Sequence, residues 1–491
     1  MSARQELGRL EAGGLIQIAA LQPELEYLFR HALVQEAAYA SLLKQDRRLL
    51  HRAAAEAILE VHPDREREFA AVVAMHFEQA GDTARAAEYL VAAGDHALER
   101  FASREAIAFF SRASALAGDG QAEVRLRASV GAAKATWSYV TTGREVDDLE
   151  RAVAAGQDAD SQLLADAYFW IAFLRHQRGE VPETSPKLKH ATERAAEIGA
   201  TLNNVGARAL PRALMGAYSS FLGHLRDGAR EMQAALADLE GKADPLSSAM
   251  IADYLAMTYA RLGEFKLAED AVARGRDHAG KGDAISRIDI DIAEAGMAYE
   301  LGELDKAAQR AFACSTRAEG LGAYACVVAS NLFAGSATLA NDDASSARPP
   351  LERGDELCML TNMAPFRTLT KGLLASTRAQ LGDLPAGEAG WREALASARE
   401  MHDRYGEARV LSARARSYAR ESRPDWKAAL ADLDEAVRLF EEMEARPALA
   451  RAVFERSKAL QALHRTAEAR EAEARSLGLG RELGLKDPQF A

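Results

Sequence analysis

One stretch of the sequence has the spacing of a phosphate-binding loop. Residues Gly275 to Lys281 read Gly-Arg-Asp-His-Ala-Gly-Lys and match the pattern G-x-x-x-x-G-K. A loop of this kind needs a strand before it, a helix after it, and a Ser or Thr directly after the lysine to bind Mg²⁺. Gly282 stands in that position, and the residues before Gly275 have a helical pattern. We therefore interpret the stretch as a flexible link between helices and predict no nucleotide hydrolysis by this chain.

The histidines, cysteines and serines also lack the spacing of a catalytic or metal site. The 11 histidines are scattered, and neither an H-E-x-x-H nor a G-x-S-x-G motif occurs. Cys314, Cys326 and Cys358 are odd in number and match neither a disulfide framework nor a paired zinc site. Cys314 falls where a helical hairpin requires a small buried residue, so we interpret it as a reduced core thiol. These patterns predict a protein that is not an enzyme and uses no cofactor.

The charge balance restricts the class of partner. Lys and Arg number 61 against 73 Asp and Glu, which gives a formal net charge of −12. General binding to nucleic acid or to an anionic membrane requires clustered positive charge, so both are disfavoured. The N-terminal residues have no signal-like apolar segment, and no run of about 18 apolar residues occurs. We expect a cytoplasmic protein.

The elements that position these residues are repeated helical hairpins. Turn-forming glycines each follow one apolar helical stretch and precede another; they are Gly81, Gly179, Gly223, Gly263, Gly302 and Gly382. With Asn341 in the same role, the last four recur about every 40 residues, against the 34 of a usual tetratricopeptide repeat. The period predicts an all-α, tetratricopeptide-like α-solenoid, a right-handed superhelix of about ten hairpins. Pro349 and Pro350 predict an interrupted helix, and the C-terminal end RSLGLGRELGLKDPQF is expected to pack loosely.

The first 30 residues differ from the repeats. Gln5–Glu11 has the pattern of a short amphipathic helix. Gly14–Leu21 and Leu25–Phe29 are β-like runs separated by Gln22-Pro23-Glu24, which predicts a β-hairpin. A further helix is expected from His31 to Leu43.

Three stretches of the N-terminal part resemble a known junction. They read LGRLEAGGLIQ, YLFRHALVQEAAYASLL and RRLLHRAAAEAIL. They are similar to the bacterial signal-transducing NTPases with numerous domains, in which a winged-helix element links the ATPase to a tetratricopeptide region. The match covers roughly residues 5–60 and begins inside the winged helix. The resemblance implies a partial winged-helix-like element over 1–50, first hairpins over 51–115, and the repeat solenoid over 116–491.

The inner face of the solenoid is the expected binding surface. In tetratricopeptide repeats, positions two, five, nine and twelve of the first helix point inward when the turn glycine is position fifteen. The candidate residues are Phe169, Phe173, His176, Met250, Asp253, Met257, Asp289, Tyr299 and Asn331. The inward positions read over the six repeats between 166 and 376 are mainly apolar and include no Lys or Arg. This disfavours a carboxylate clamp and favours an apolar peptide, a partner helix or a mostly neutral small effector.

Two interpretations remain open at this point. Phe169 and Phe173 either face a ligand groove or pack as core against the neighbouring repeat. The chain itself is either a non-catalytic regulatory solenoid that binds a protein, peptide or effector, or a DNA-binding regulator that acts through its N-terminal element. The resemblance implies a kinase, cyclase or ATPase as the protein partner of the first. Against the second, Ser2–Leu21 contains only Arg4 and Arg9 as basic residues.

Overall fold

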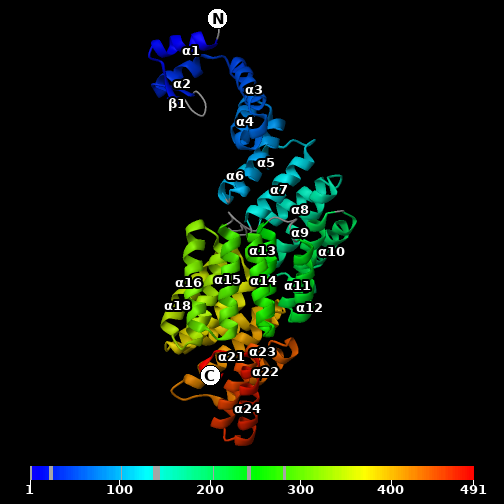
Figure 1. Ribbon diagram of the computed structural model, residues 1–491, viewed down its shortest axis with the longest axis vertical. Helices are drawn as coiled ribbons and strands as arrows, with labels where there is room; N and C mark the ends of the chain where they lie inside the picture. Colours follow the sequence, from blue (N-terminus) through cyan, green and yellow to red (C-terminus); the bar gives the residue numbers. More distant parts are fainter. Residues whose placement is uncertain are drawn as a thin grey trace.

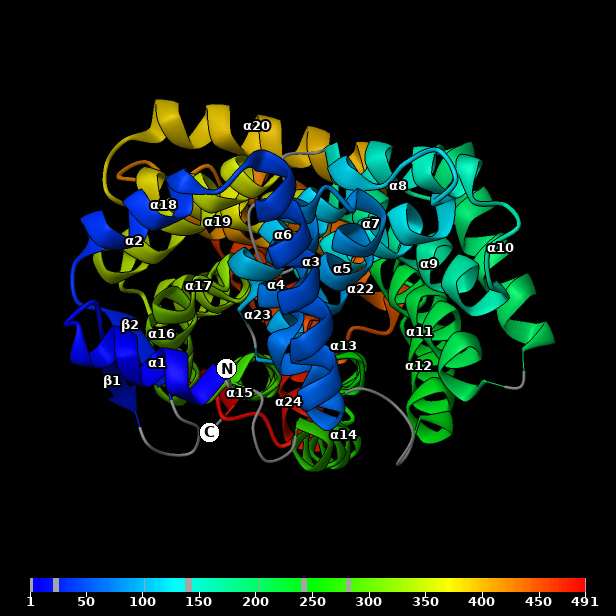
Figure 2. The ribbon, with the colours of Figure 1, turned by 90° about the horizontal axis from the view of Figure 1, so that it is seen from above.

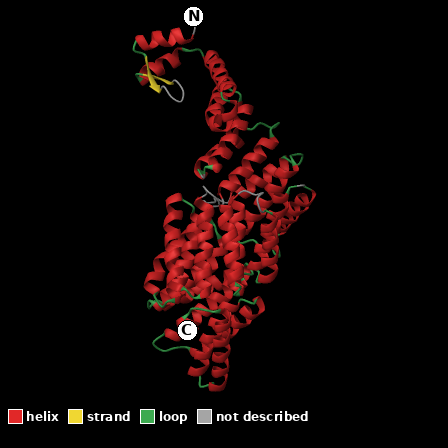
Figure 3. Ribbon diagram, in the orientation of Figure 1, coloured by secondary structure: helices red, strands yellow, loops and turns green. Residues whose placement is uncertain are grey.

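The computed structural model describes residues 3–20, 26–100, 102–136, 144–202, 204–239, 245–279 and 284–490. These residues form 24 α-helices and a two-stranded antiparallel sheet, which confirms the expected all-α solenoid (Figure 3). None of the described helices is both long enough and apolar enough to cross a membrane.

The N-terminal element contains the expected β-hairpin. It consists of α1 (Ala3–Ala12), β1 (Ile16–Ala20), β2 (Glu26–Phe29) and α2 (Ala32–Ser41). The strands pair antiparallel, with Ile16 opposite Phe29. The expected turn at Gln22-Pro23-Glu24 lies outside the described residues. This element stands at one end of the elongated molecule, and the C-terminal helices stand at the other (Figure 1).

Helical hairpins make up the rest of the chain. Their helices are α3 (Lys44–Val61), α4 (Glu66–Ala80), α5 (Thr83–Glu99), α6 (Ser103–Leu116), α7 (Ala122–Thr136), α8 (Arg144–Ala155), α9 (Ser161–Gln177), α10 (Pro186–Thr201), α11 (Val205–Phe221), α12 (Leu225–Asp238), α13 (Pro245–Leu262), α14 (Phe265–Ala279), α15 (Ala284–Leu301), α16 (Leu304–Leu321), α17 (Tyr324–Ala340), α18 (Ala344–Thr361), α19 (Ala364–Gln380), α20 (Leu384–Glu400), α21 (Arg404–Arg420), α22 (Trp426–Met443), α23 (Arg446–Ala462) and α24 (Thr466–Leu483). Short 3-10 turns occur at Pro63–Arg65 and Pro488–Phe490.

The hairpins follow one another around a ring. The odd-numbered helices α9 to α23 contact each other in sequence, and each even-numbered helix packs against its own hairpin partner. Seen along the long axis, α10, α12, α14 and α20 lie at the periphery (Figure 2). The odd-numbered helices α9 to α23 are therefore called the inner helices below. The domain division at 115 falls at the end of α6, whereas the division at 50 falls inside α3; the division itself stays a prediction.

The turns show why glycine recurs and where it is replaced. Gly263 and Gly302 have φ of 80° and 89°, a region that side chains with a Cβ rarely adopt. In later repeats other residues take this conformation, among them Asp342, His402 and Glu444. The expected turn residue Asn341 is thus displaced by one position, because Asn341 itself has φ of −83°.

Three sequence-based expectations about local structure are corrected. Pro349 and Pro350 lie inside α18, which continues to Thr361, because its buried face keeps it helical despite two missing backbone donors. Gly275 to Ala279 end α14, so this half of the loop-like motif is helix and not a link; Gly280 to Gly282 lie outside the described residues. The C-terminal end packs tightly, since Leu485, Asp487 and Phe490 are all buried.

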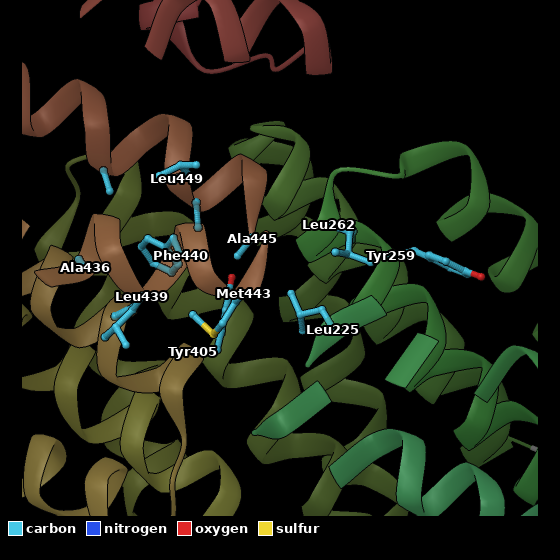
Figure 4. Close-up of a cluster of buried hydrophobic side chains, with 14 of the residues drawn as sticks. Leu225, Tyr259, Leu262, Tyr405, Ala436, Leu439, Phe440, Met443, Ala445 and Leu449 are labelled. Atoms are coloured by element: carbon cyan, nitrogen blue, oxygen red, sulfur yellow. The ribbon is translucent and has the colours of Figure 1, made fainter. Parts of the chain in front are cut away.

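Successive turns of the superhelix pack directly on each other. The turn at Gly223 lies against Met443 and the turn at Gly263 lies against Leu483, and each pair is 220 residues apart in the chain. The largest hydrophobic cluster correspondingly joins α11–α15 to α19–α24. Figure 4 shows Met443 beside Leu225 in this cluster. The solenoid thus closes on itself, and this closure encloses the space between the inner helices.

Candidate functional site

An apolar cavity lies between the inner helices. Its volume is about 150 Å³, and residues of α9, α11, α13, α15, α17, α19 and α21 form its wall. Most of the wall is apolar, including Phe169, Phe173, Leu210, Met250, Met257, Ile292, Leu332, Phe333, Phe366 and Leu369. Seven helices converge here because the superhelix completes a turn, so the cavity has no counterpart within a single hairpin.

Two further cavities adjoin the apolar one. A larger cavity of about 310 Å³ shares Glu300, Ser336 and Arg409 with it, and a small one of about 40 Å³ shares Asp253 and Ile292. Helix α17 passes the three cavities one after another. Its first residues line the small cavity, its middle lines the apolar cavity, and its last residues line the larger one. We call the three together the channel.

The structure brings most of the predicted site residues to this channel. Phe169, Phe173, His176, Met250, Asp253 and Met257 line the apolar cavity, Asp289 lines the small one, and Tyr299 lines the larger one. Asn331 lines none of them, and its amide oxygen accepts a hydrogen bond from Ser315 Oγ at 3.0 Å. Ligand binding by these residues stays a prediction.

Phe169 and Phe173 fit both interpretations of the sequence. Their rings lie 6.3 Å apart, both pack edge-on against Trp170, and each is almost fully buried. They also line the apolar cavity. The two aromatic residues therefore form core and cavity wall at once.

Several polar atoms at the channel wall have no hydrogen-bond partner. They are His176 Nδ1, Gln177 Oε1, Asp253 Oδ1 and Arg261 Nε. Burial lowers the pKa of His176 to about 4, so its imidazole is neutral at pH 7. Buried polar groups are normally satisfied, and a concentration of exceptions in one cavity suits a ligand or water that supplies the partners.

Two carboxyl groups, Asp253 of α13 and Asp289 of α15, line the small cavity. Burial raises the pKa of Asp253 well above its usual range, and the nearby charge of Asp289 raises it further. Asp289 Oδ1 accepts a hydrogen bond from Cys326 Sγ at 3.2 Å. A cation placed between the two carboxyl groups would relieve their repulsion.

The wall of the larger cavity carries five basic residues that sequence reasoning missed, beside the four acidic residues Glu300, Asp342, Glu455 and Asp487. Arg409, Arg416 and Arg420 of α21 line it together with Arg451 and Lys458 of α23. The turn between α21 and α22, residues 421–425, contains no glycine, so the pattern that marks the inward positions ends with the α19–α20 hairpin. The spacing of the α21 arginines, which places them on one helical face, is a signal that could have found them. These basic residues lie beyond the six repeats whose inward positions were predicted.

A buried polar cluster stands where the two main cavities meet. Tyr405 donates a hydrogen bond to Glu300 Oε1 at 2.5 Å, and the guanidinium groups of Arg409 and Arg451 lie 3.8 and 3.5 Å from the Glu300 carboxylate. Arg451 also bonds both carboxylate oxygens of Asp487, at 2.7 and 2.8 Å. The cluster links α15 to α21, α23 and the C-terminal end, and it holds the turn of the superhelix closed.

At the far end of the larger cavity, two cations share one anion. Arg416 donates to Asp342 Oδ1 at 2.8 Å, and Arg420 donates to the same oxygen. Burial opposes ionisation of Asp342, but the bonds from Arg420 and the charge of Arg416 lower its pKa overall. This end of the channel can accept a second anion.

Comparison with solved structures shows the fold. The chain is similar to a Rap protein complexed with Competence and Sporulation Factor, with a TM-score of 0.55, 12% identity, and coverage of 74% of this chain and 99% of that chain. A signal transduction ATPase with a tetratricopeptide repeat sensor from Pyrococcus horikoshii also matches, at 12% identity over 76% of this chain and 56% of that one. Its TM-score of 0.40 is too low to support an argument. No family model and no curated protein matches the chain.

Proposed function

We propose that this chain is a non-catalytic regulatory protein that binds a peptide, or an extended segment of a partner protein, inside the channel. The observation that carries the proposal is the enclosed apolar cavity with unpartnered polar atoms on its wall. Apolar surface with a few convergent polar groups is the usual character of a binding site. A Rap protein of similar fold has been solved with a factor bound, which supports a binding role for a superhelix of this kind.

The N-terminal element is the proposed route for the signal. Residues 5–60 carry the resemblance to signalling NTPases. Helices α2 and α3 and the link between them expose large apolar side chains such as Leu33, Leu43 and Leu50. We propose that this surface contacts a kinase, cyclase or ATPase domain, and that occupation of the channel alters the contact. A cytoplasmic location belongs to the same proposal and agrees with three buried free cysteines. A small effector is the alternative ligand, and a DNA-binding role for the N-terminal element is the alternative function.

The test of this function compares two variants of one helix. Ala217 of α11 lines the apolar cavity, whereas Met215 of the same helix is 41% exposed on the outside. Ala217→Phe should fill the cavity, and Met215→Phe places the same side chain in solvent. A mixture of random decapeptides is incubated with each protein, and the retained peptides are measured by mass spectrometry.

We expect the unmodified protein and Met215→Phe to retain the same subset of peptides and Ala217→Phe to lose it. Circular dichroism and thermal unfolding check that each variant is folded. Equal retention by Ala217→Phe would overturn the function.

A further inference from the structure

We propose that the channel selects a short extended peptide with free termini and fixes its direction, with the amino terminus between Asp253 and Asp289 and the carboxylate at Arg416, Arg420 and Lys458. This inference rests on the proposed function and adds to it the length, charge and orientation of the ligand. Three observations carry it: an acidic end, a basic end, and the distance between them.

The acidic end has the chemistry of an ammonium site. Asp253 Oδ1 is buried without a partner, and the second carboxyl group, Asp289, lies close enough to repel it. His176, which is 8% exposed, lines the same cavity and leaves Nδ1 without a partner. An ammonium group bears three donors, so it can satisfy Asp253 and Asp289 together and still have one donor for a neighbouring acceptor.

At the basic end, the cationic side chains outnumber their acidic partners by one. Arg416 and Arg420 share the single carboxylate of Asp342, and Lys458, which pairs with Glu455 at 3.1 Å, lines the same cavity. Asp342 is also 60% exposed, so its charge is shared with solvent. Guanidinium groups bind carboxylates through two parallel hydrogen bonds, which makes a peptide C-terminus a suitable second anion.

The distance between the two ends follows from α17. Asp289 contacts Cys326 near the start of this helix, and Asp342 follows its last residue. Sixteen residues separate Cys326 from Asp342, and a rise of about 1.5 Å per residue makes the axial separation roughly 24 Å. An extended chain advances about 3.3–3.6 Å per residue, so about seven residues span the channel.

The middle of the channel sets the character of the internal residues. Phe173, Met257, Leu332 and Phe366 surround the segment between the two charged ends. Burying apolar side chains beside these four residues is favourable, and Glu300 and Arg409 add charged groups where the apolar cavity meets the larger one. The ligand is therefore a peptide of about seven residues with an apolar interior.

The peptide termini themselves provide the experiment. The probe is a heptapeptide mixture with randomised apolar internal positions, made in four forms: free at both ends, N-acetylated, C-amidated, and blocked at both ends. We expect each block to weaken binding about 10- to 100-fold, the usual effect of losing a hydrogen-bonded charge. A tetrapeptide mixture should respond to at most one block, because it cannot reach both ends.

Variants then assign each terminus to its site. Asp253→Asn should abolish the effect of acetylation and leave that of amidation, while the double variant Arg416→Gln/Arg420→Gln should do the reverse. Exposed Asp270→Asn and Arg392→Gln are the matched controls and should change neither effect. The blocked peptides need no variant, so the inference stays testable even if a substitution unfolds the protein.

The outcomes separate the two proposals. Equal binding of all four peptide forms would overturn the direction and the free termini but leave peptide binding standing. An amidation effect that disappears in Asp253→Asn would show the opposite orientation and overturn the inference. Failure of every decapeptide and heptapeptide to bind would instead overturn the proposed function.

Discussion

The N-terminal hairpins and the closed superhelix are built from the same kind of unit but are stabilised differently. Helices α2 to α6 contact mainly their neighbours in the chain, and in α3 only Ala55 is buried. In the superhelix, the turns at Gly179, Gly223 and Gly263 also meet residues that lie a full superhelical turn away, as Gly263 meets Leu483. A hairpin array therefore gains a second buried interface only when its superhelix closes. The cavity between the inner helices arises from the same closure.

Single residues show the same contrast. Leu50 of α3 is 56% exposed, whereas Leu236 of α12 is fully buried. A Cβ added at Gly81 would approach only the flexible Arg48 side chain, but one added at Gly302 would overlap the Asp487 carboxylate. The same position of the repeat thus contributes differently to the free energy of unfolding in the two regions.

The largest effect is expected at the cluster that holds the turn closed. Glu300→Ala leaves Arg409 and Arg451 in buried surroundings without their shared carboxylate, which should lower the free energy of unfolding by about 3–5 kcal/mol. Urea unfolding measures the change. Glu356→Ala removes an exposed ion pair with Arg353 and should cost at most about 1 kcal/mol. A similar cost for the two variants would show that closure contributes little.

Two glycine substitutions compare a loop that contacts the next turn of the superhelix with a loop that does not. Gly302 and Gly382 have φ of 89° and 96°, but a Cβ at Gly382 meets no atom within 4 Å. Gly382→Ala should cost about 1–2 kcal/mol through backbone strain alone. Gly302→Ala should cost about 1–3 kcal/mol more, because the methyl group overlaps Asp487. Equal shifts in the unfolding midpoint would contradict packing between turns.

The free energy of unfolding, measured over a range of pH, tests the burial of Asp403 at the cavity wall. Burial raises the pKa of Asp403 to about 6, although Gly406 N–H donates to its carboxylate. The unfolded pKa is near 3.8, so the stabilising contribution is full below pH 4 and is lost as the pH rises through 6. Relative to Asp403→Asn, the unmodified protein should lose up to about 3 kcal/mol of unfolding free energy over that range.

Asp343 is the matched control, because it caps α18 in the same way but is exposed. Its hydrogen bonds from Ser346 lower its pKa, so the sign reverses. Relative to Asp343→Asn, the unmodified protein should become less stable as the pH falls below 4. If stability relative to Asp403→Asn and relative to Asp343→Asn changed in the same direction with pH, burial would not distinguish the two aspartates.

The smallest effect is expected in the N-terminal hairpins. Leu50→Ser should change the free energy of unfolding by less than about 0.5 kcal/mol, because the side chain is mostly exposed. Leu236→Ala in the superhelix should cost about 2–5 kcal/mol. Thermal and urea unfolding measure both. A large loss in Leu50→Ser would mean that the N-terminal hairpins share the stability of the closed part.

Much of the local structure follows from the sequence alone. The spacing of apolar residues around Gly263 predicts the α13–α14 hairpin, and the inward positions Met250, Asp253 and Met257 follow from the same register. The β-like runs on either side of Gln22-Pro23-Glu24 predict the N-terminal sheet, whose strands are present. These predictions succeed because backbone hydrogen bonding and side-chain periodicity act over a few residues.

The local helical pattern does not predict every feature of the repeats. Sequence reasoning missed Arg409, Arg416 and Arg420 because the turn between α21 and α22, residues 421–425, lacks the glycine that marks the repeat. It interpreted Pro349 and Pro350 as a break, but burial of Leu351 and Leu357 keeps α18 helical. In both cases, packing with other helices overrides a local preference.

By itself, then, the sequence determined the hairpins, their inner faces and the apolar character of the first repeats. Only the tertiary structure decided that Glu300 meets Tyr405 and Arg451, that Asp253 and Asp289 line one cavity, and that a charged wall completes the channel. The reason is geometric: the pitch of the superhelix is the sum of small rotations between hairpins. Such a sum, which brings residues 220 positions apart into contact, cannot be read from any single repeat.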